Sequence, residues 1–264
     1  MCGIAGYSLA DSSALDRTLA AQALLAGIAE RGADAVGYAH RSPGGRVVVH
    51  KQHSGPSALL EQIAIPASAT EVLVHVRDYT KGHPTIAANN HPIRHGAVVG
   101  IHNGVIFNDD ELLAEHNCAR AEPGMTVDSE AIFALAAHSQ GHPRALEALC
   151  GSMAAAWLDE RHARSVYVAR GVGRPLWVGR GDEGAFFAST KLALELLERY
   201  LGVRLAKREL EEGTLVALKR GHEARRHGFS PNRAFEERPL PAVRAPNERA
   251  SCLRRLATIV ATAG

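Results

Sequence analysis

The pattern of apolar and polar positions along the chain predicts alternating groups of strands and helices. Residues 2–9 and 71–76 are short apolar runs typical of buried strands. Between residues 14 and 30, apolar side chains recur every three or four positions, which is the spacing of a helix that packs on a sheet. Two β-prone runs flank Ser42-Pro43-Gly44-Gly45, so a hairpin is predicted over residues 36–51.

The middle and later parts of the chain are also predicted to contain strands, helices and loops. A polar segment over residues 77–95, interrupted by two prolines, is predicted to be a long loop, and a strand over 97–101 leads into His102-Asn103-Gly104. Further strands are predicted at 152–158, 165–169, 175–178, 185–188 and 214–218, and further helices after Asn108-Asp109-Asp110, from Asp128, and at 143–149 and 190–200. Strands in groups between helices favour an α+β fold with largely antiparallel sheets covered by helices.

The composition changes after residue 220, where Arg, Pro, Asn and Glu become frequent. This change predicts a domain over residues 2–220 and a C-terminal arm or partner-contacting extension over 221–264, with a short helix at its apolar end. Basic residues cluster at 219–227, but acidic residues are interspersed among them and beyond. We therefore interpret this stretch as a solvated arm rather than a nucleic-acid site.

Composition and charge narrow the class of protein. The chain has 264 residues, is 46% apolar, and carries 30 basic and 28 acidic residues, so its charge does not demand a polyanionic partner. The four cysteines form no C-x-x-C pair, and no apolar run approaches the roughly 18–20 residues of a membrane span. A cytoplasmic protein without membrane contact is expected. The histidine-rich segment 75–102 has no H-E-x-x-H or comparable spacing, so neither a metal nor a cofactor is expected.

Cys2 follows the initiator methionine and can therefore become the N-terminal residue. After removal of Met1, one residue would carry both a thiol and a free α-amine, whose ordinary pKa of about 7.7–8.0 suits a general base. A thiol beside such a base can attack a carbonyl carbon. Without support from other residues, Cys2 would simply be a small apolar residue that opens a strand.

Three other positions offer the remaining parts of an amide hydrolase. Asn103-Gly104 can supply a side-chain amide and an unhindered N–H to a developing oxyanion. Arg77 follows a buried strand, so its guanidinium is expected at a sheet edge where it can bind a carboxylate, and Asp128 can hold an ammonium group. Taken alone, these residues are more often a turn, a solvated arginine and a helix cap. Together, Arg77 and Asp128 predict a site for an amino acid.

The order of these motifs resembles that of class II glutamine amidotransferases, in particular the glutaminase domains of glucosamine-6-phosphate synthase and amidophosphoribosyltransferase. The resemblance covers about residues 2–220 and is far more specific than any one motif. It rests on these segments in chain order: CGIAGY at residues 2–7, ERGADAVG at 30–37, His75-Val76-Arg77 with Thr80 and Gly82, His91-Pro92, HNGVI at 102–106, and Val127-Asp128-Ser129-Glu130. The later strands around Ala169-Arg170-Gly171 and Phe187-Ala188-Ser189 also resemble those of the family.

The resemblance implies an N-terminal nucleophile hydrolase fold, a four-layer αββα sandwich. It implies that Cys2 attacks the side-chain amide of L-glutamine and that its α-amine takes the thiol proton and delivers it to the leaving ammonia. Asn103 and the Gly104 N–H are then expected to form the oxyanion hole. Arg77, Thr80 and Asp128 are expected to bind the substrate's carboxylate and amine. Arg31 matches the family arginine near the nucleophile.

The chain also departs from the family pattern. In the loop after Arg77, Asp78 and Lys81 replace a tryptophan and a histidine, and Phe107 stands where a glutamate is common. Because the chain ends at residue 264, the acceptor of ammonia is expected on a separate synthetase or transferase. Two alternatives stay open: a catalytically silent regulatory or binding module, and a hydrolase of other γ-glutamyl amides. Homo-oligomerisation is also open.

Overall fold

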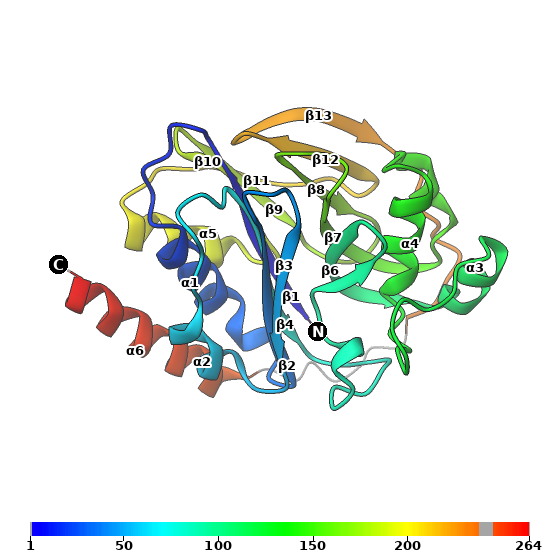
Figure 1. Ribbon diagram of the computed structural model, residues 1–264, viewed down its shortest axis with the longest axis horizontal. Helices are drawn as coiled ribbons and strands as arrows, with labels where there is room; N and C mark the ends of the chain where they lie inside the picture. Colours follow the sequence, from blue (N-terminus) through cyan, green and yellow to red (C-terminus); the bar gives the residue numbers. More distant parts are fainter. Residues whose placement is uncertain (1, 238–244, 264) are drawn as a thin grey trace.

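The computed structural model describes residues 2–237 and 245–263 and consists of two antiparallel sheets packed face to face between helices (Figure 1). The first sheet has the strand order β11-β9-β10-β1-β4-β2-β3 and the second β13-β12-β8-β7-β6-β5. The strands are β1 Gly3–Leu9, β2 Ala35–Arg41, β3 Val47–Gln52, β4 Glu71–Arg77, β5 Ile93–His95, β6 Val98–Ile106, β7 Gly151–Asp159, β8 Ser165–Arg170, β9 Trp177–Gly181, β10 Gly184–Ala188, β11 Ala206–Glu209, β12 Thr214–Lys219 and β13 His222–Gly228.

Helices form the two outer layers. In Figure 1, α1, α5 and α6 lie on one side of the paired sheets, and α3 and α4 lie on the other. The helices are α1 Arg17–Ile28, α2 Pro56–Leu59, α3 Asp109–Glu115, α4 Glu130–His138, α5 Lys191–Leu201 and α6 Pro246–Ala263, with short 3-10 turns at Ala29–Arg31, Leu60–Gln62, Ala87–Asn89 and Pro143–Ala148. This arrangement confirms the α+β class and the four-layer αββα sandwich that the sequence predicts.

Three apolar layers hold the sandwich together. The layer between the sheets contains residues such as Leu73, Ile101 and Phe187. A second layer joins the first sheet to α1 and α5 through Leu24 and Leu197, and a third joins the second sheet to α4. Burial on this scale removes most of the apolar surface of the strands from water, which is the main stabilising contribution to such a fold.

Most predicted elements occur, but several details differ. Helix α1 begins at Arg17, later than the predicted start at residue 14, and is capped by Asp16, which accepts a hydrogen bond from Leu19 N. The prediction that Asn103-Gly104 follows a strand is wrong, because β6 continues through both residues to Ile106. Asn108 occupies the N-cap position of α3, but its side chain bonds Ala148 O and Cys150 N instead of the helix.

The region after residue 220 is more ordered than the predicted arm. Strand β13 pairs with β12 at the edge of the second sheet, although its sequence is almost entirely polar. Helix α6 then packs against α1 and α2, with Cys252 and Leu256 fully buried. The division of the chain at residue 220 into a domain and an extension stays a prediction.

The register of β1 and β4 determines where the candidate nucleophile lies. Gly3 is opposite Val76, so the next positions along the two strands bring Cys2 beside Arg77. Gly3 also has no room for a side chain, since a Cβ there would lie 2.9 Å from Ile28 Cβ and 3.2 Å from Arg31 Cδ. The start of β1, the end of β4 and the turn after α1 therefore meet at one point.

Candidate active site

Cys2 lies where the two sheets approach the loop that follows β4. Its thiol donates a hydrogen bond to the carbonyl of Asp78 (3.4 Å), and its own carbonyl accepts one from Arg31 Nε (2.8 Å). Burial raises the pKa of the Cys2 thiol, and nearby positive charges, including Arg77, act in the opposite direction. Deprotonation in this position therefore needs a base close to the sulfur.

Cys2 belongs to a small cavity, which we call the Cys2 cavity. Five of the seven predicted site residues line it: Cys2, Arg77, Thr80, Gly104 and Asp128. The segment 78–81, His91, His102, Val127 and Ser129 complete the wall. The volume of the cavity is about 10 Å³, which is room for about one water molecule. Asn103 and Arg31 do not line the cavity, but each adjoins a residue that does.

Arg77 is the last residue of β4, which lies inside the first sheet, and only 1% of its surface is exposed. It is therefore buried and not at the predicted sheet edge. Its guanidinium donates hydrogen bonds to Asn90 Oδ1 (2.7 Å), Lys81 O (2.8 Å) and Gly82 O (2.5 Å). Carbonyl oxygens thus occupy the donors that sequence reasoning assigns to a substrate carboxylate.

Gly104 has a backbone conformation that demands glycine. Its φ angle is 152°, and a Cβ atom there would lie 1.9 Å from Ser152 O and 2.7 Å from His102 Nε2. The neighbouring Asn103 is fully buried, and neither its amide nitrogen nor its amide oxygen has a hydrogen-bond partner among the described residues. Such a buried amide is costly unless it serves a ligand or a reacting group.

Asp128 does not cap α4, although it precedes the helix. Its Oδ2 accepts a hydrogen bond from Ile106 N (2.7 Å), and the side chain is buried. Burial raises the pKa of this carboxyl group to about 6. Asp128 is thus a carboxylate at neutral pH, held at the end of β6 and facing the same cavity as Cys2.

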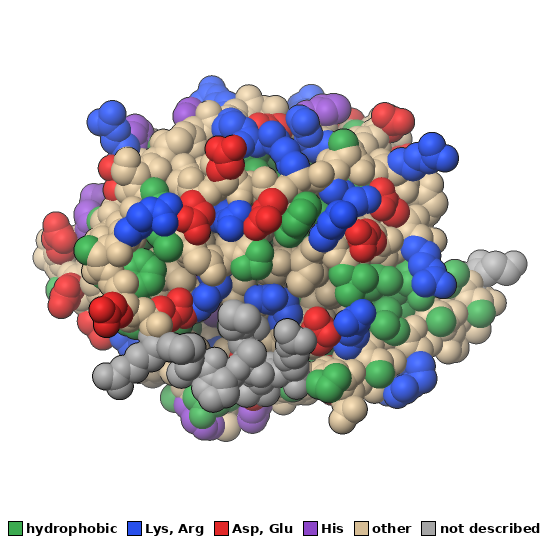
Figure 2. All heavy atoms as spheres, turned by 180° about the vertical axis from the view of Figure 1, so that it is seen from behind, with side chains coloured by type: hydrophobic (Ala, Val, Ile, Leu, Met, Phe, Trp, Pro, Cys, Tyr) green, Lys and Arg blue, Asp and Glu red, His purple; other side chains and the backbone are tan. Residues whose placement is uncertain are grey.

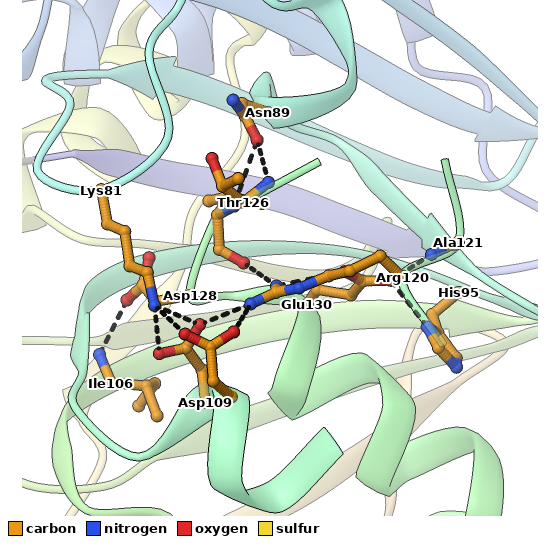
Figure 3. Close-up of polar contacts among 12 residues, drawn as sticks. Lys81, Asn89, His95, Ile106, Asp109, Arg120, Ala121, Thr126, Asp128 and Glu130 are labelled. Carbon is orange, nitrogen blue, oxygen red and sulfur yellow. Dashed lines mark hydrogen bonds and ion pairs between the residues drawn. The ribbon is translucent and has the colours of Figure 1, made fainter. Parts of the chain in front are cut away.

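A charged network fixes the loop at the mouth of the cavity (Figure 3). Lys81 Nζ lies 2.7 Å from both carboxylate oxygens of Asp109, and Arg120 bonds the same carboxylate at 2.8 Å. Arg120 also reaches Asp110 (2.5 Å) and Glu130 (3.2 Å). The loop, α3 and α4 are thereby joined through a buried carboxylate, since Asp109 is only 1% exposed. Sequence reasoning missed Asp109 and Arg120 altogether, because nothing local marks them.

Three buried histidines surround the site. The rings of His75 and His91 stack with their centroids 4.2 Å apart, and His75 Nε2 lies 3.0 Å from His102 O. Burial lowers the pKa of His75 and of His102 to about 3, and lowers that of His91 well below its usual value. All three are neutral at pH 7 and are therefore poor general acids. In residues 2–237 and 245–263, no group of three or more His, Cys, Asp or Glu side chains is placed to hold a metal ion.

Comparison with known proteins agrees with this architecture. A family model described as a glutamine amidotransferase domain matches residues 70–196. Glutamine–fructose-6-phosphate aminotransferase (isomerizing) of Caulobacter vibrioides is 33% identical over 253 residues, with 92% of this chain and 39% of that protein covered. The same enzyme of Escherichia coli K12 is 30% identical, with 83% and 36% covered. The chain thus spans well under half the length of these relatives.

Solved structures share the fold at lower sequence identity. The glutamine phosphoribosylpyrophosphate amidotransferase of B. subtilis has a TM-score of 0.68 at 19% identity and covers 88% of this chain and 50% of its own. A glutamine aminotransferase class-II domain protein from Silicibacter pomeroyi has a TM-score of 0.54 at 16% identity, with 88% and 100% covered.

The fold defines the class: two antiparallel sheets between helix layers, with Cys2 directly before the central strand β1, match the N-terminal nucleophile hydrolase fold of amidotransferase structures. The chain belongs to the class II glutamine amidotransferases and contains a domain related to the glutaminase domains of glucosamine-6-phosphate synthase and phosphoribosylpyrophosphate amidotransferase. Within the described residues, no helix is both long and apolar enough to cross a membrane.

Proposed function

We propose that this chain is a glutaminase that hydrolyses the side-chain amide of glutamine through a thioester on Cys2 and releases glutamate and ammonia. The observation that carries the proposal is that Cys2, Arg77, Gly104 and Asp128, from four separate segments, line one cavity. Membership of the glutamine amidotransferase family supports glutamine as the substrate.

The proposed mechanism requires removal of Met1, which frees the α-amine of Cys2. An α-amine has an ordinary pKa of about 7.7–8.0 and is a far stronger base than the neutral histidines nearby. It accepts the thiol proton as the sulfur attacks the amide carbon. The Asn103 amide and the Gly104 N–H stabilise the oxyanion, and the amine then protonates the leaving ammonia. Water then attacks the thioester carbonyl while the amine takes its proton, the C–S bond breaks to release glutamate, and the proton passes from the amine to the Cys2 thiolate.

Substrate binding is assigned to both ends of the zwitterion. Arg77 and Thr80 bind the α-carboxylate, and Asp128 binds the α-ammonium group. Arg31 positions Cys2 by donating a hydrogen bond to the Cys2 backbone carbonyl. Glutamine does not fit a cavity of about 10 Å³. The segment 78–82 therefore has to move on binding, and the substrate carboxylate replaces the carbonyls of Lys81 and Gly82 on Arg77.

The ammonia is assigned to a synthetase or transferase. The described residues belong to the two sheets, the helices that cover them and their connections. We propose a separate subunit. The proposal includes a glutaminase domain over 2–220 and a partner-contacting extension over 221–264. Because β13 belongs to the second sheet, we assign the contact with the partner subunit to residues after Gly228.

The decisive experiment measures glutamate and ammonia release from glutamine, together with the intact mass of the protein. The wild type should lack Met1 and turn over glutamine. Cys2→Ala should lower kcat by about 10⁴-fold or more, because the covalent nucleophile is lost. Cys118→Ala, which removes a half-buried thiol elsewhere, is the matched control and should retain full activity.

Other results would contradict the proposal in distinct ways. Full activity with Met1 in place, or in Cys2→Ala, would disprove the mechanism. Glutamine binding without turnover would favour the silent module, and faster release from another γ-glutamyl amide would change the substrate. Co-purification of a synthetase or transferase would identify the acceptor, whereas glutaminase activity unaffected by any such protein would argue against a separate subunit.

A further inference from the structure

A second concave region lies on the outer face of the second sheet, at the end formed by β8, β12 and β13 near the top of Figure 1. Helix α4 packs on β5 and β6 of the same sheet. The turns at Gln140-Gly141 and Arg161-His162-Ala163 form its side wall. We call this region the β12–β13 groove. Its volume is about 490 Å³, within the usual range for small-molecule sites, and it shares no residue with the Cys2 cavity.

The charges that line the β12–β13 groove have one sign. Its lining contains Arg161, His162, Lys219, Arg225 and His227 and no carboxylate. Arg161 is paired with the buried Asp159 (2.6 Å). Among the described residues, Lys219 and Arg225 form no ion pair, although the chain as a whole is nearly balanced in charge.

Charges elsewhere on the surface are arranged differently. On the face seen in Figure 2, Lys and Arg side chains lie next to Asp and Glu side chains. On β13 itself, Arg226 pairs with Glu223 at 2.8 Å, although Arg225 beside it has no such partner. Lys219 and Arg225 both line the groove, and both would attract a bound anion.

The floor of the groove is apolar and aromatic. Tyr167 and Leu215 project outward from β8 and β12, and Tyr167 stacks on the buried Trp157 with an interplanar angle of 13° and ring centroids 5.5 Å apart. The Tyr167 hydroxyl is fixed 2.9 Å from His162 Nδ1. A rigid aromatic floor under a basic rim suits a ligand with an organic body as well as a negative charge.

We infer that the β12–β13 groove binds a small organic anion of the phosphate-ester class. Lys219 and Arg225 contact its phosphate oxygens, and Tyr167 and Leu215 contact its body. Arginine and lysine are the side chains that proteins use for phosphate groups, and here both line one groove. The concave shape and the volume of about 490 Å³ favour a small molecule over a nucleic acid or an acidic protein segment.

The inference is tested by calorimetry on the full chain at low ionic strength, with uridine diphosphate and inorganic pyrophosphate as probes. Both should bind, and uridine diphosphate should bind more tightly because it has a body to cover the floor. The double variant Lys219→Glu and Arg225→Glu should weaken binding by about 100-fold, about tenfold for each charge-assisted contact. The matched control reverses the charge of two exposed arginines elsewhere, through Arg199→Glu and Arg254→Glu. This control should bind both probes like the wild type.

Three results would overturn the inference. The first is no binding of either probe at millimolar concentration, and the second is equal weakening in both double variants, which would indicate only a response to net charge. The third is preferential binding of a poly-glutamate peptide, which would make the groove a protein-docking surface. Glutamine hydrolysis should be unchanged in both double variants, so loss of anion binding is measured independently of the glutaminase reaction.

Discussion

The Cys2 cavity and the β12–β13 groove differ in how their cations are compensated. In the Cys2 cavity, Arg77 is bound by three oxygens, and Lys81 is bound by Asp109. In the groove, Lys219 and Arg225 have no such partners among the described residues, and the volume is about 490 Å³ against about 10 Å³. A ligand of the groove only adds contacts, whereas the proposed binding of glutamine to Arg77 requires replacement of contacts that already exist.

This difference assigns distinct energetic roles to the two regions. Interactions at the Cys2 cavity stabilise the folded chain as well as the site. Substitutions there should therefore lower the free energy of unfolding. The groove holds uncompensated charge that contributes little to stability, so changes there should affect ligand binding alone. Paired substitutions, one in each region, separate these two roles, and the pH dependence of glutamine binding reports the charge state of the cavity.

The largest effect is expected for glycine substitutions. Gly104→Ala places a Cβ atom 1.9 Å from Ser152 O at a φ of 152°, so the neighbouring strands β6 and β7 have to shift. A loss of about 4 kcal/mol or more in unfolding free energy is expected. Gly141→Ala, in the wall of the groove, also has a positive φ (78°) but meets only Tyr167 Cε1 at 3.9 Å, so about 1 kcal/mol is expected. Chemical denaturation measures both, and equal losses would contradict the contrast.

The requirement for Gly104 illustrates what the sequence can predict. Asn103-Gly104 is recognisable as a candidate oxyanion hole from its motif, and the apolar runs around Cys2 and Arg77 predict two strands. The burial of Arg77 could not be predicted, because it depends on β4 lying between β1 and β2. The network of Lys81, Asp109 and Arg120 joins residues far apart in the chain and has no local pattern.

The polar strand β13 was missed for a related reason. Its residues are mostly exposed, so no apolar alternation marks it, and it is defined by hydrogen bonding to β12. The same residues explain the groove. A basic run looks like a solvated arm until pairing with β12 places Arg225 and His227 on one face with Lys219.

A second, smaller effect is expected for neutral substitutions of charged residues. Asp109→Asn removes the buried carboxylate that binds Lys81 and Arg120. Because both cations are partly exposed and Asp110 remains beside them, the cost should be about 2 kcal/mol, below that of a fully buried pair. Lys219→Gln should change stability by less than about 0.5 kcal/mol, since no ion pair is lost.

Hydrogen exchange provides an independent measurement of the same contrast. In Asp109→Asn, backbone amides of residues 79–82 should exchange faster, because the loop loses its attachment to α3. In Lys219→Gln, exchange in that loop should be unchanged. Unaltered loop protection in Asp109→Asn would show that the network does not hold the loop closed.

The smallest effect concerns the pH dependence of glutamine binding. Burial raises the pKa of Asp128 to about 6, so its carboxyl group is charged at pH 7 and becomes neutral as the pH falls below 6. An ammonium group then loses its ionic partner. With binding restricted to the charged form, the Kd of glutamine should increase about tenfold between pH 7 and pH 5. Calorimetry on Cys2→Ala measures this without turnover.

Two controls connect this change to Asp128 rather than to general loss of structure. The double variant Cys2→Ala and Asp128→Asn should bind glutamine weakly and with little dependence on pH between 5 and 7. In the same double variant at pH 7, pyrophosphate binding to the groove should be unchanged, because Asp128 does not line the groove. If glutamine affinity is constant from pH 7 to pH 5 in Cys2→Ala, Asp128 is not the group that holds the ammonium. If both ligands weaken together, the cavity and the groove are not the separate sites that their charges indicate.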